Sequence, residues 1–305
     1  MDIEFIDSKR FPKAPPIPAF RTALANNLKK LPRYDVVIVG DDNAFSFALQ
    51  EQGGLFRSIP LVFLVVYNIG KAIAQNNAPR VTGVVEEASD AGALKLVRDL
   101  YPTAEKIYIG HKEFTPTGRA NTRRTRAGVR VLGIRNAEII SMSKLTYDKL
   151  WHRLSRLPAG APLMLNGACR DRLGKRLDYL EVLNRTKEAF GGAVFSSQQH
   201  GIGHGVVGGY VVCHMEQGRI AGNKVVAILS GVPVGNIKVA AQSPNIFLFD
   251  HNELARLGLE DRKLPSNSEI INQPKEKLRT YAEWLIAGMT ALGLQMTLIV
   301  VLVGP

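Results

Sequence analysis

Short apolar runs alternate with stretches of helical periodicity along most of this chain, which predicts alternating strands and helices. The run at 61–67 is apolar on both faces, as expected of a central strand in a parallel sheet. This rhythm is typical of βαβ units, so we predict an α/β fold. The expected strands are 3–6, 35–40, 61–67, 106–110, 137–141, 162–165, 193–196, 210–213, 237–239 and 245–249. The expected helices are 19–31, 91–100, an arginine-rich helix opened by 115–117, 146–156, 177–190 and 216–229.

The pattern continues without a break between domains. No low-complexity linker divides the chain, and no internal sequence repeat stands out. Two αβ halves joined by crossovers therefore explain the sequence better than independent domains in series.

The C-terminal run from Trp284 to Val303 carries no charge, and its length is about what a helix needs to cross a bilayer. Trp284 stands at its head, where amphipathic rings favour the headgroup layer, and Gln295 is its one strongly polar side chain. We predict a transmembrane helix over 284–303. A buried C-terminal helix is the alternative.

The chain of 305 residues has a net charge of +12, which would suit a nucleic acid or an anionic membrane. The charge is mostly dispersed. Its densest patch contains residues that recur at helical spacing, and a solvated helix face is favoured there over an anion-binding surface. The patch consists of Arg119, Arg123, Arg124, Arg126 and Arg130. A basic nucleic-acid-binding protein is therefore a weak rival, and we expect no nucleic-acid partner.

Cys169 and Cys213 are the two cysteines, and each lies beside an apolar, strand-like stretch. Two small buried thiols are the default expectation, and a single disulfide remains the alternative. The N-terminus shows no basic segment followed by an apolar one, so an exported domain would need a signal upstream of Met1.

Polar residues follow several of the predicted strands. Ligands of open parallel sheets bind beyond the carboxyl ends of the strands, so these loops are candidate binding loops. As a group they favour a small polar ligand, although Asp and Asn are also common helix caps. The candidates from these loops are Asp41, Asp42 and Asn43 after 35–40, Asn68 after 61–67, Thr115 and Thr117 after 106–110, and Asn166 and Arg170 after 162–165.

Two motifs suggest a dinucleotide-binding loop and a metal site, but each has a better explanation. Gly203, Gly205 and Gly208 have the spacing of a dinucleotide-binding loop, but a strand-like stretch follows them, so a glycine-rich crossover between lobes is the better interpretation. His200, His204 and His214, with Glu216, suggest a metal site, but the intervening glycines argue against the helix that would align them. We expect no metal and no cofactor. No nucleophile elbow, phosphate-binding lysine loop or HExxH motif occurs, so the sequence does not support an enzyme.

Five segments together resemble the ABC-transporter substrate-binding-protein-like family. They are Ile6-Asp7-Ser8-Lys9-Arg10-Phe11, the stretch from Tyr34 to Ala44, the stretch from Val81 to Glu86, Thr115-Pro116-Thr117-Gly118, and the stretch from Gly205 to Gly209. They occur in the family's order over almost the whole chain before the apolar tail. The chain is most similar to the version of this domain that serves as the extracytoplasmic sensor of bacterial membrane histidine kinases or diguanylate cyclases.

The resemblance implies a type I periplasmic-binding-protein fold, in which two Rossmann-like lobes close on a ligand. The expected division is 1–87 with 206–272 for the N-terminal lobe and 88–205 for the C-terminal lobe. Family members begin with a further strand and helix before the segment matching 3–6, so we expect the first lobe as given to lack its first strand. Lys275, Lys277 and Arg279 would favour a cytoplasmic location for the residues before the span, but the family topology places the domain outside.

We therefore expect a small-molecule-binding sensor in the bacterial inner membrane, with its main domain periplasmic or extracytoplasmic. The sequence leaves the identity of the ligand open, and some relatives of the fold in transporters bind amino acids. The output is expected to be a cytoplasmic kinase or cyclase module in cis. A homodimer is left open. The alternative is the solute-binding protein of an ABC importer.

The resemblance also adds one residue to the expected site. Glu86 lies near a crossover on the cleft side, where it either contacts ligand or braces the hinge. Asp42 and Asn43 from one lobe are expected to face Thr115, Thr117 and Arg170 from the other.

Overall fold

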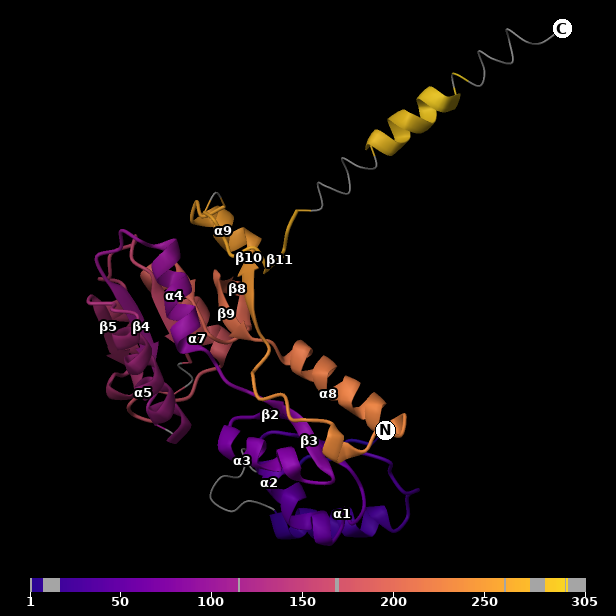
Figure 1. Cartoon of the computed structure of the whole chain (residues 1–305). Helices are drawn as coiled ribbons and strands as arrows, with labels where there is room; N and C mark the ends of the chain where they lie inside the picture. Colours follow the sequence, from indigo (N-terminus) through magenta and orange to yellow (C-terminus); the bar gives the residue numbers. More distant parts are fainter. Residues whose placement is uncertain are drawn as a thin grey trace, which may run out of the picture.

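The computed structural model describes residues 2–7, 17–114, 116–167, 170–260, 262–274, 283–293 and 295, and for Pro116, Thr117 and Ala120 only the backbone. These residues form two α/β lobes (Figure 1). A three-stranded sheet organises the N-terminal lobe, and a seven-stranded sheet organises the C-terminal lobe.

The smaller sheet has the strand order β1-β2-β3 and is parallel throughout. Its strands are β1 (Val37–Gly40), β2 (Leu61–Val66) and β3 (Val81–Val85). β2 and β3 are rich in β-branched residues, and β2 is the central strand of the sheet. β3 is an edge strand but is buried along its whole length, with Ala240 bridged to Val84 beside it. Phe45 and Phe63 are fully buried in the core beside this sheet.

The larger sheet has the strand order β11-β10-β9-β7-β6-β4-β5. Its neighbouring strands run parallel except for the antiparallel pair β9 and β10. The strands of this lobe are β4 (Ile107–His111), β5 (Ala137–Ser141), β6 (Leu163–Asn166), β7 (Val194–Phe195), β8 (His200–Val206), β9 (Gly208–Val212), β10 (Asn245–Asp250) and β11 (Ser268–Ile271). Two apolar clusters form the core of this lobe.

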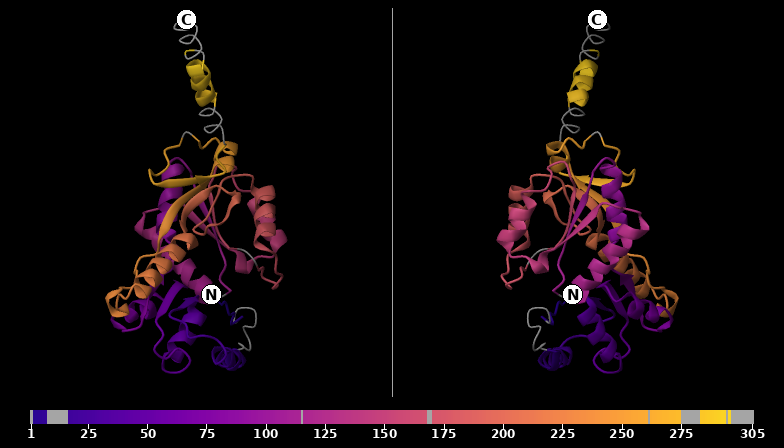
Figure 2. Two further views of the ribbon diagram at one scale, coloured as in Figure 1. Left: turned by 90° about the vertical axis from the view of Figure 1, so that its right-hand side faces the viewer. Right: turned by 90° about the vertical axis from the view of Figure 1, so that its left-hand side faces the viewer.

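Helices cover both sheets (Figures 1 and 2). Those of the N-terminal lobe are α1 (Ile17–Leu28), α2 (Asp42–Gln50), α3 (Ile69–Ile73) and α8 (His214–Leu229). Those of the C-terminal lobe are α4 (Asp90–Leu100), α5 (Pro116–Val131), α6 (Tyr147–Leu154), α7 (Tyr179–Phe190) and α9 (His251–Arg256). Short 3₁₀ turns lie at Glu51–Gly53, Ala74–Asn77, Met142–Lys144 and Val234–Asn236.

The chain passes between the lobes three times. It leaves the N-terminal lobe after β3, returns from β9 to α8 through Cys213, and leaves again between 240 and 245. The first and third passages are bonded to each other: Ala240 pairs with Val84 as a parallel bridge, and the side-chain amide of Asn245 donates to the carbonyl of Glu87 (2.9 Å). The lobes are therefore joined by a compact hinge of three segments.

Most of the predicted strands and helices are present within one to three residues of the expected bounds. The strand at 137–141 has the expected bounds, and the arginine-rich helix forms as α5, with Arg123, Arg126 and Arg130 exposed. The two-lobe α/β architecture predicted from the alternation is confirmed.

Three local predictions are wrong. Residues 3–6 form no strand, and Ile3 and Phe5 are exposed. The stretch 237–239 is not a strand, although Ala240 beside it pairs with β3. The glycine-rich stretch 201–209 is not a crossover, because β8 and β9 both lie in the C-terminal lobe. Glycine is still required within this stretch, because Gly205 has φ +111°, a backbone conformation that other residues rarely adopt.

The lobes are also divided differently from the expected bounds. We expected 206–272 to join the N-terminal lobe. In the structure, β9, β10 and β11 pair within the seven-stranded sheet. From this part of the chain, α8 packs against β2 and β3. The difference arises because the chain adds β9 to the C-terminal lobe before it crosses to form α8, and adds β10 and β11 after it crosses back.

The apolar tail is described over 283–293, where it forms a helix that lies apart from both lobes (Figure 1). Its large apolar side chains are exposed, with Trp284 at 74% and Leu292 at 62%, which contradicts the buried-helix alternative for this stretch. Among the described residues, no helix has both the length and the apolar character that crossing a membrane requires. The rest of the expected span, except Gln295, lies outside the described residues, as does Cys169.

We predict that Gly209→Ala destabilises the protein by about 2 kcal/mol or more. A Cβ at this position of β9 would overlap the carbonyl oxygen of Ser196, and backbone atoms cannot move away as a flexible side chain can. Thermal unfolding would measure the change. Gly218→Ala is the matched control: nothing lies within 4 Å of the added Cβ on α8, so this variant should gain stability from its better helix propensity. Equal melting temperatures for the two variants would contradict the packing argument.

Candidate functional site

The carboxyl ends of the N-terminal strands bring four of the expected site residues together. Asp41 caps α2 by accepting the N–H of Asn43 (3.0 Å). The carboxylate of Asp42 accepts the N–H of Asn68 (3.0 Å), which ties the end of β1 to the end of β2. Asn68 in turn caps α3 through the N–H of Lys71 (3.1 Å). These residues thus serve as helix caps and also form one polar cluster.

The backbone is strained at the same edge of the sheet. Asp41 has φ +85° and ψ +151°, a region that is almost exclusive to glycine. Val65, near the end of β2, has φ +58°, which is unfavourable for a β-branched side chain. The N–H of Asp41 donates to the carbonyl of Leu64 (3.2 Å), so the two strained residues are neighbours. Strain of this kind concentrates at ligand sites and switch regions.

Glu86, directly after β3, is the most deeply buried carboxylate of this edge, with a side chain 0% exposed. Its Oε2 accepts the side-chain N–H of Gln217 (3.0 Å) and lies 3.4 Å from Nε2 of His214. Both partners are on α8. No described group hydrogen bonds to its Oε1. A buried carboxylate with an unsatisfied oxygen is costly, so this atom is the strongest single candidate for contacting a ligand.

Tyr67 follows β2 beside this carboxylate. Burial and the neighbouring Glu86 raise the pKa of Tyr67 above its usual range, and Asp42 and Asp41 act in the same direction. The phenol therefore stays protonated at physiological pH, and its hydroxyl is directed at the Glu86 carboxylate. The N-terminal edge of the site is acidic, with one neutral aromatic donor.

A buried polar network lies at the carboxyl ends of the C-terminal strands. Thr125 on α5 donates to Asp90 (2.7 Å) and lies 2.7 Å from Nε2 of His111. Asn166, at the end of β6, donates to Asp90 (3.2 Å) and accepts from the backbone N–H of Ser197 (3.2 Å). Asp90 follows Glu86 across the first passage between lobes, so the carboxyl edges of both sheets meet at the hinge.

Burial lowers the pKa of His111, outweighing the opposite effects of Asp90 and Glu113. The imidazole is therefore neutral at pH 7, and its Nε2–H donates to Thr125 when the Thr125 hydroxyl donates to Asp90. Burial also lowers the pKa of His200, with further contributions from His214 and Lys112. The charges of His214 and Lys112 therefore act on His200, although the three residues are far apart in the sequence.

The expected residues of the C-terminal lobe are less tightly grouped. Arg170 is exposed, and its guanidinium lies 5.5 Å from the centroid of the Phe114 ring. Asn166 uses its side chain within the polar network of its own lobe. Thr115 lies outside the described residues, and for Thr117 only the helical backbone is described. The expected contact of these residues with Asp42 and Asn43 stays a prediction.

Several residues of the site were not predicted from the sequence. Tyr67 falls at the end of the predicted strand 61–67, and Gln217 falls in an ordinary predicted helix. His111 begins one of the candidate loops without being singled out, and Asp90 carries no signal. A signal existed for His111, because it ends an apolar strand. No local signal distinguishes Gln217, because its role depends on the strand against which α8 packs.

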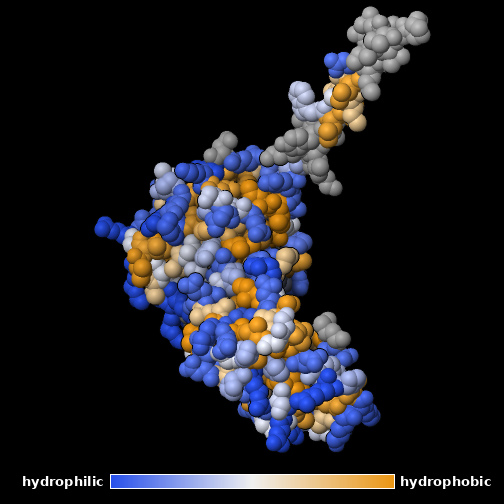
Figure 3. All heavy atoms as spheres, turned by 45° about the vertical axis from the view of Figure 1, so that its right-hand side comes forward, coloured by the Kyte–Doolittle hydropathy of each residue, from blue (hydrophilic) through white to orange (hydrophobic). Residues whose placement is uncertain are grey.

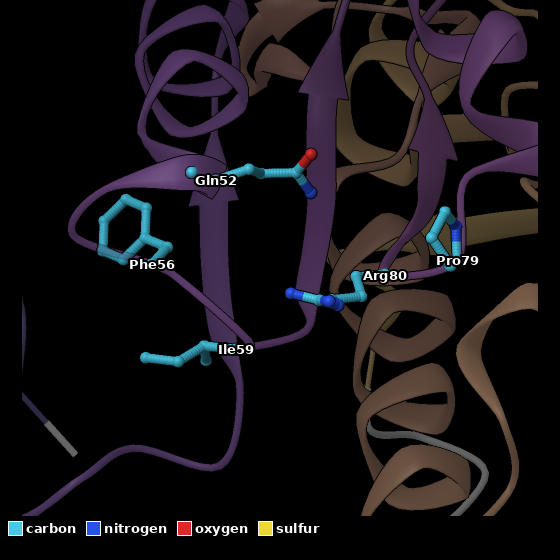
Figure 4. Close-up of a pocket in the computed structure, with 6 residues that line it drawn as sticks. Gln52, Phe56, Ile59, Pro79 and Arg80 are labelled. Carbon is cyan, nitrogen blue, oxygen red and sulfur yellow. The ribbon is translucent and has the colours of Figure 1, made fainter.

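A pocket elsewhere in the N-terminal lobe is separate from this site (Figure 4). It is lined by Gln52, Gly53, Phe56, Ile59, Pro79 and Arg80. Ile59 precedes β2 and Arg80 precedes β3, so the pocket lies at the amino ends of these strands, opposite the polar cluster. Among the residues that the structure describes, no three His, Cys, Asp or Glu side chains are placed to hold a metal ion.

Comparison with known proteins shows the fold. No family model matches the chain, and no curated protein matches its sequence. The ligand-free, open structure of CD0873, a substrate-binding protein with adhesive properties from Clostridium difficile, is similar over 85% of this chain and 84% of that chain, with 14% identity and a TM-score of 0.59. The ABC domain from Streptococcus pneumoniae in complex with L-Trp is similar over 82% of this chain and 84% of that chain (14%, 0.53).

A conserved domain protein from Vibrio cholerae gives a comparable match, over 82% of this chain and 81% of that chain, with 13% identity and a TM-score of 0.52. These identities are low, so the matches establish architecture and not activity. The chain has the two-lobe α/β fold of substrate-binding proteins. This confirms the fold implied by the family resemblance.

We predict that acidification destabilises the protein partly through His111. Because burial lowers the pKa of His111 in the folded chain, the unfolded chain takes up a proton first as the pH falls. The contribution of the neutral imidazole to stability is complete above the unfolded pKa of about 6.5 and is lost below it. His111→Gln keeps an N–H donor for Thr125, so its melting temperature should fall less than that of the wild type between pH 7 and pH 5. The exposed His152 provides the control, since His152→Gln should keep the wild-type slope.

Proposed function

We propose that this chain is a small-molecule-binding sensor domain, in which the two lobes close on a ligand at the hinge. The observation that carries this proposal is the buried carboxylate of Glu86, whose Oε1 has no partner among the described residues. The surrounding polar cluster, the strained backbone and the meeting of both carboxyl edges support the same location. In open α/β sheets, this is where ligands bind.

The proposed ligand is an amino acid or a related compound. The N-terminal edge offers the carboxylates of Asp42 and Glu86, which suit a protonated amine. The C-terminal edge offers the cations of Lys112 and Arg170, which suit a carboxylate. The pneumococcal structure with L-Trp gives a precedent for an amino-acid ligand on this fold. We propose a binding protein and not an enzyme, because the solved structures that this fold resembles include substrate-binding proteins.

We further propose that the C-terminal tail anchors the domain in the bacterial inner membrane, with the lobes on the extracytoplasmic side. In the described helix at 283–293, Glu283 is the only charged residue, and large apolar side chains are exposed on it, among them Trp284, Ile286 and Leu292. The helix projects away from the lobes (Figure 3). Such a helix is unfavourable in water and favourable in lipid. The run without charge continues in the sequence to Val303.

In this proposal, lobe closure biases the helix after β11 and thereby a cytoplasmic kinase or cyclase output module in cis. β11 is an edge strand of the large sheet, and the chain runs from it toward the tail. The second candidate is a solute-binding protein of an ABC importer, which has the same fold. The apolar tail favours the sensor over the importer component.

We predict that Glu86→Gln weakens ligand binding by roughly ten- to a hundredfold, which corresponds to the 1.5–3 kcal/mol of a hydrogen bond to a charged group. L-Trp and a panel of other amino acids would be tested by calorimetry on the full chain in mild detergent. The exposed neighbour provides the control, and Glu87→Gln should bind as the wild type does. Unchanged affinity in Glu86→Gln for a ligand that the wild type binds would contradict the contact role and leave a hinge role.

We also predict that the full chain sediments with membranes, whereas a chain ending at Thr280 does not. The apolar run supplies the membrane affinity in this proposal, so removing it should release the lobes without unfolding them. Fractionation of cells expressing each form would measure this, and circular dichroism would verify that the shorter form is folded. Recovery of the full chain in the soluble fraction would rule out anchoring by the tail.

A further inference from the structure

Gln217 uses both ends of its side-chain amide inside the N-terminal lobe. The residue is completely buried on α8. Its Oε1 accepts the backbone N–H of Val65 (2.8 Å), and its Nε2 donates to Oε2 of Glu86 (3.0 Å). One side chain therefore links the end of β2 to the start of the first passage between the lobes.

The conformation of Val65 makes this link necessary. Its positive φ accompanies a register shift between Phe63 and Val66 in the pairing of β2 with β3. A residue in such an irregularity loses its partner in the ladder, and its buried N–H then needs another acceptor. Gln217 supplies that acceptor. Without it, the strained conformation would lose the bond that holds it.

The two ends of the link are also connected through the backbone. The N–H of Glu86 donates to the carbonyl of Val66 (2.9 Å), so a movement of the β2 end acts on Glu86 directly. Tyr67 and Asn68, which belong to the candidate site, follow without a break. Cys213, in the second passage, caps α8 at the N–H of Glu216. Gln217 thus lies where the β2 end and two of the three passages come together.

We propose that Gln217 is a positioning residue that couples the β2 end to the hinge, so that residues 64–68 and 85–89 rearrange as one unit. The coupling is a property of the lobe itself, and its use in transmitting ligand binding rests on the function proposed above. A strained conformation persists only where its surroundings hold it, and Gln217 supplies one of the bonds that hold Val65.

Hydrogen exchange of the full chain in mild detergent, without any ligand, tests the coupling. Gln217→Met keeps the approximate volume of the side chain and removes both hydrogen bonds. Exchange should accelerate in 64–68 and in 85–89 together, by roughly three- to tenfold, the effect of losing one or two buried hydrogen bonds. β1, in the same lobe, should exchange as in the wild type. Acceleration in 64–68 alone would overturn the coupling, and equal acceleration across β1, β2 and β3 would show a merely structural role.

Gln217→Glu supplies a second test with a readout that packing alone would not move. The new side chain keeps the acceptor for Val65 but places a second carboxylate beside Glu86. When both carboxylates are ionised they repel each other, so the link is broken. The same repulsion raises the pKa of one member of the pair, and acidification then protonates it and restores a hydrogen bond between them. The difference in melting temperature between wild type and variant should therefore shrink from pH 8 to pH 5, and exchange in 64–68 and 85–89 should slow in parallel.

The charged and titratable groups around this position define the controls. Glu86 faces it from the end of β3, His214 lies on its own helix, and Tyr67 lies at the end of β2. Asn223→Asp adds the same charge on the exposed side of α8 and should show no rescue by acid. A pH-independent defect in Gln217→Glu, or the same rescue in Asn223→Asp, would overturn the proposal. Because no ligand is used, these outcomes are independent of whether the chain binds an amino acid.

Discussion

The burial of the Glu86 carboxylate is the constraint on which the arrangement of the hinge depends. A charged group removed from water must be hydrogen bonded, and here the donors come from α8, which belongs to a later part of the chain. This requirement fixes α8 against β2 and β3 and brings the second passage between the lobes beside the first. Since Oε1 remains unsatisfied among the described residues, the same carboxylate that organises the hinge also favours a further donor from outside the protein.

The fold could be predicted from the sequence where a local pattern determines it. β2 is apolar on both faces because helices cover the sheet on both sides, and such a run is recognisable without a structure. β3 is not among the expected strands, because Thr82 and Gly83 interrupt its apolar run. Residues 3–6 show the limit of this reasoning. Their composition suits a strand, but a strand forms only when a neighbour pairs with it, and a periodic pattern does not reveal whether the neighbour is present. The bounds of the lobes failed similarly, because pairing of β9 to β11 is a long-range property.

The site was partly predictable for a topological reason. In a parallel sheet, all carboxyl ends lie at one edge, so Asp41, Asp42 and Asn68 had to come together if the strands were identified correctly. The supporting residues could not be found in this way. In the sequence, Gln217 is an ordinary polar residue on an amphipathic helix. Its amide is needed because Val65 has a positive φ and its N–H requires an acceptor, and no sequence pattern indicates that conformation.

The lobe closure proposed above also needs a difference in ligand affinity between the open and closed states, since a ligand that binds both equally shifts neither. The charges of the two edges provide a physical source for such a difference. Asp42 and Glu86 belong to one lobe, whereas Lys112 and Arg170 belong to the other. A ligand with a cationic and an anionic group can satisfy one edge in the open state but needs closure to satisfy both. The second set of charged hydrogen bonds then forms only on closure, and each is worth about 1.5–3 kcal/mol, which is enough to favour the closed state by a factor of ten or more.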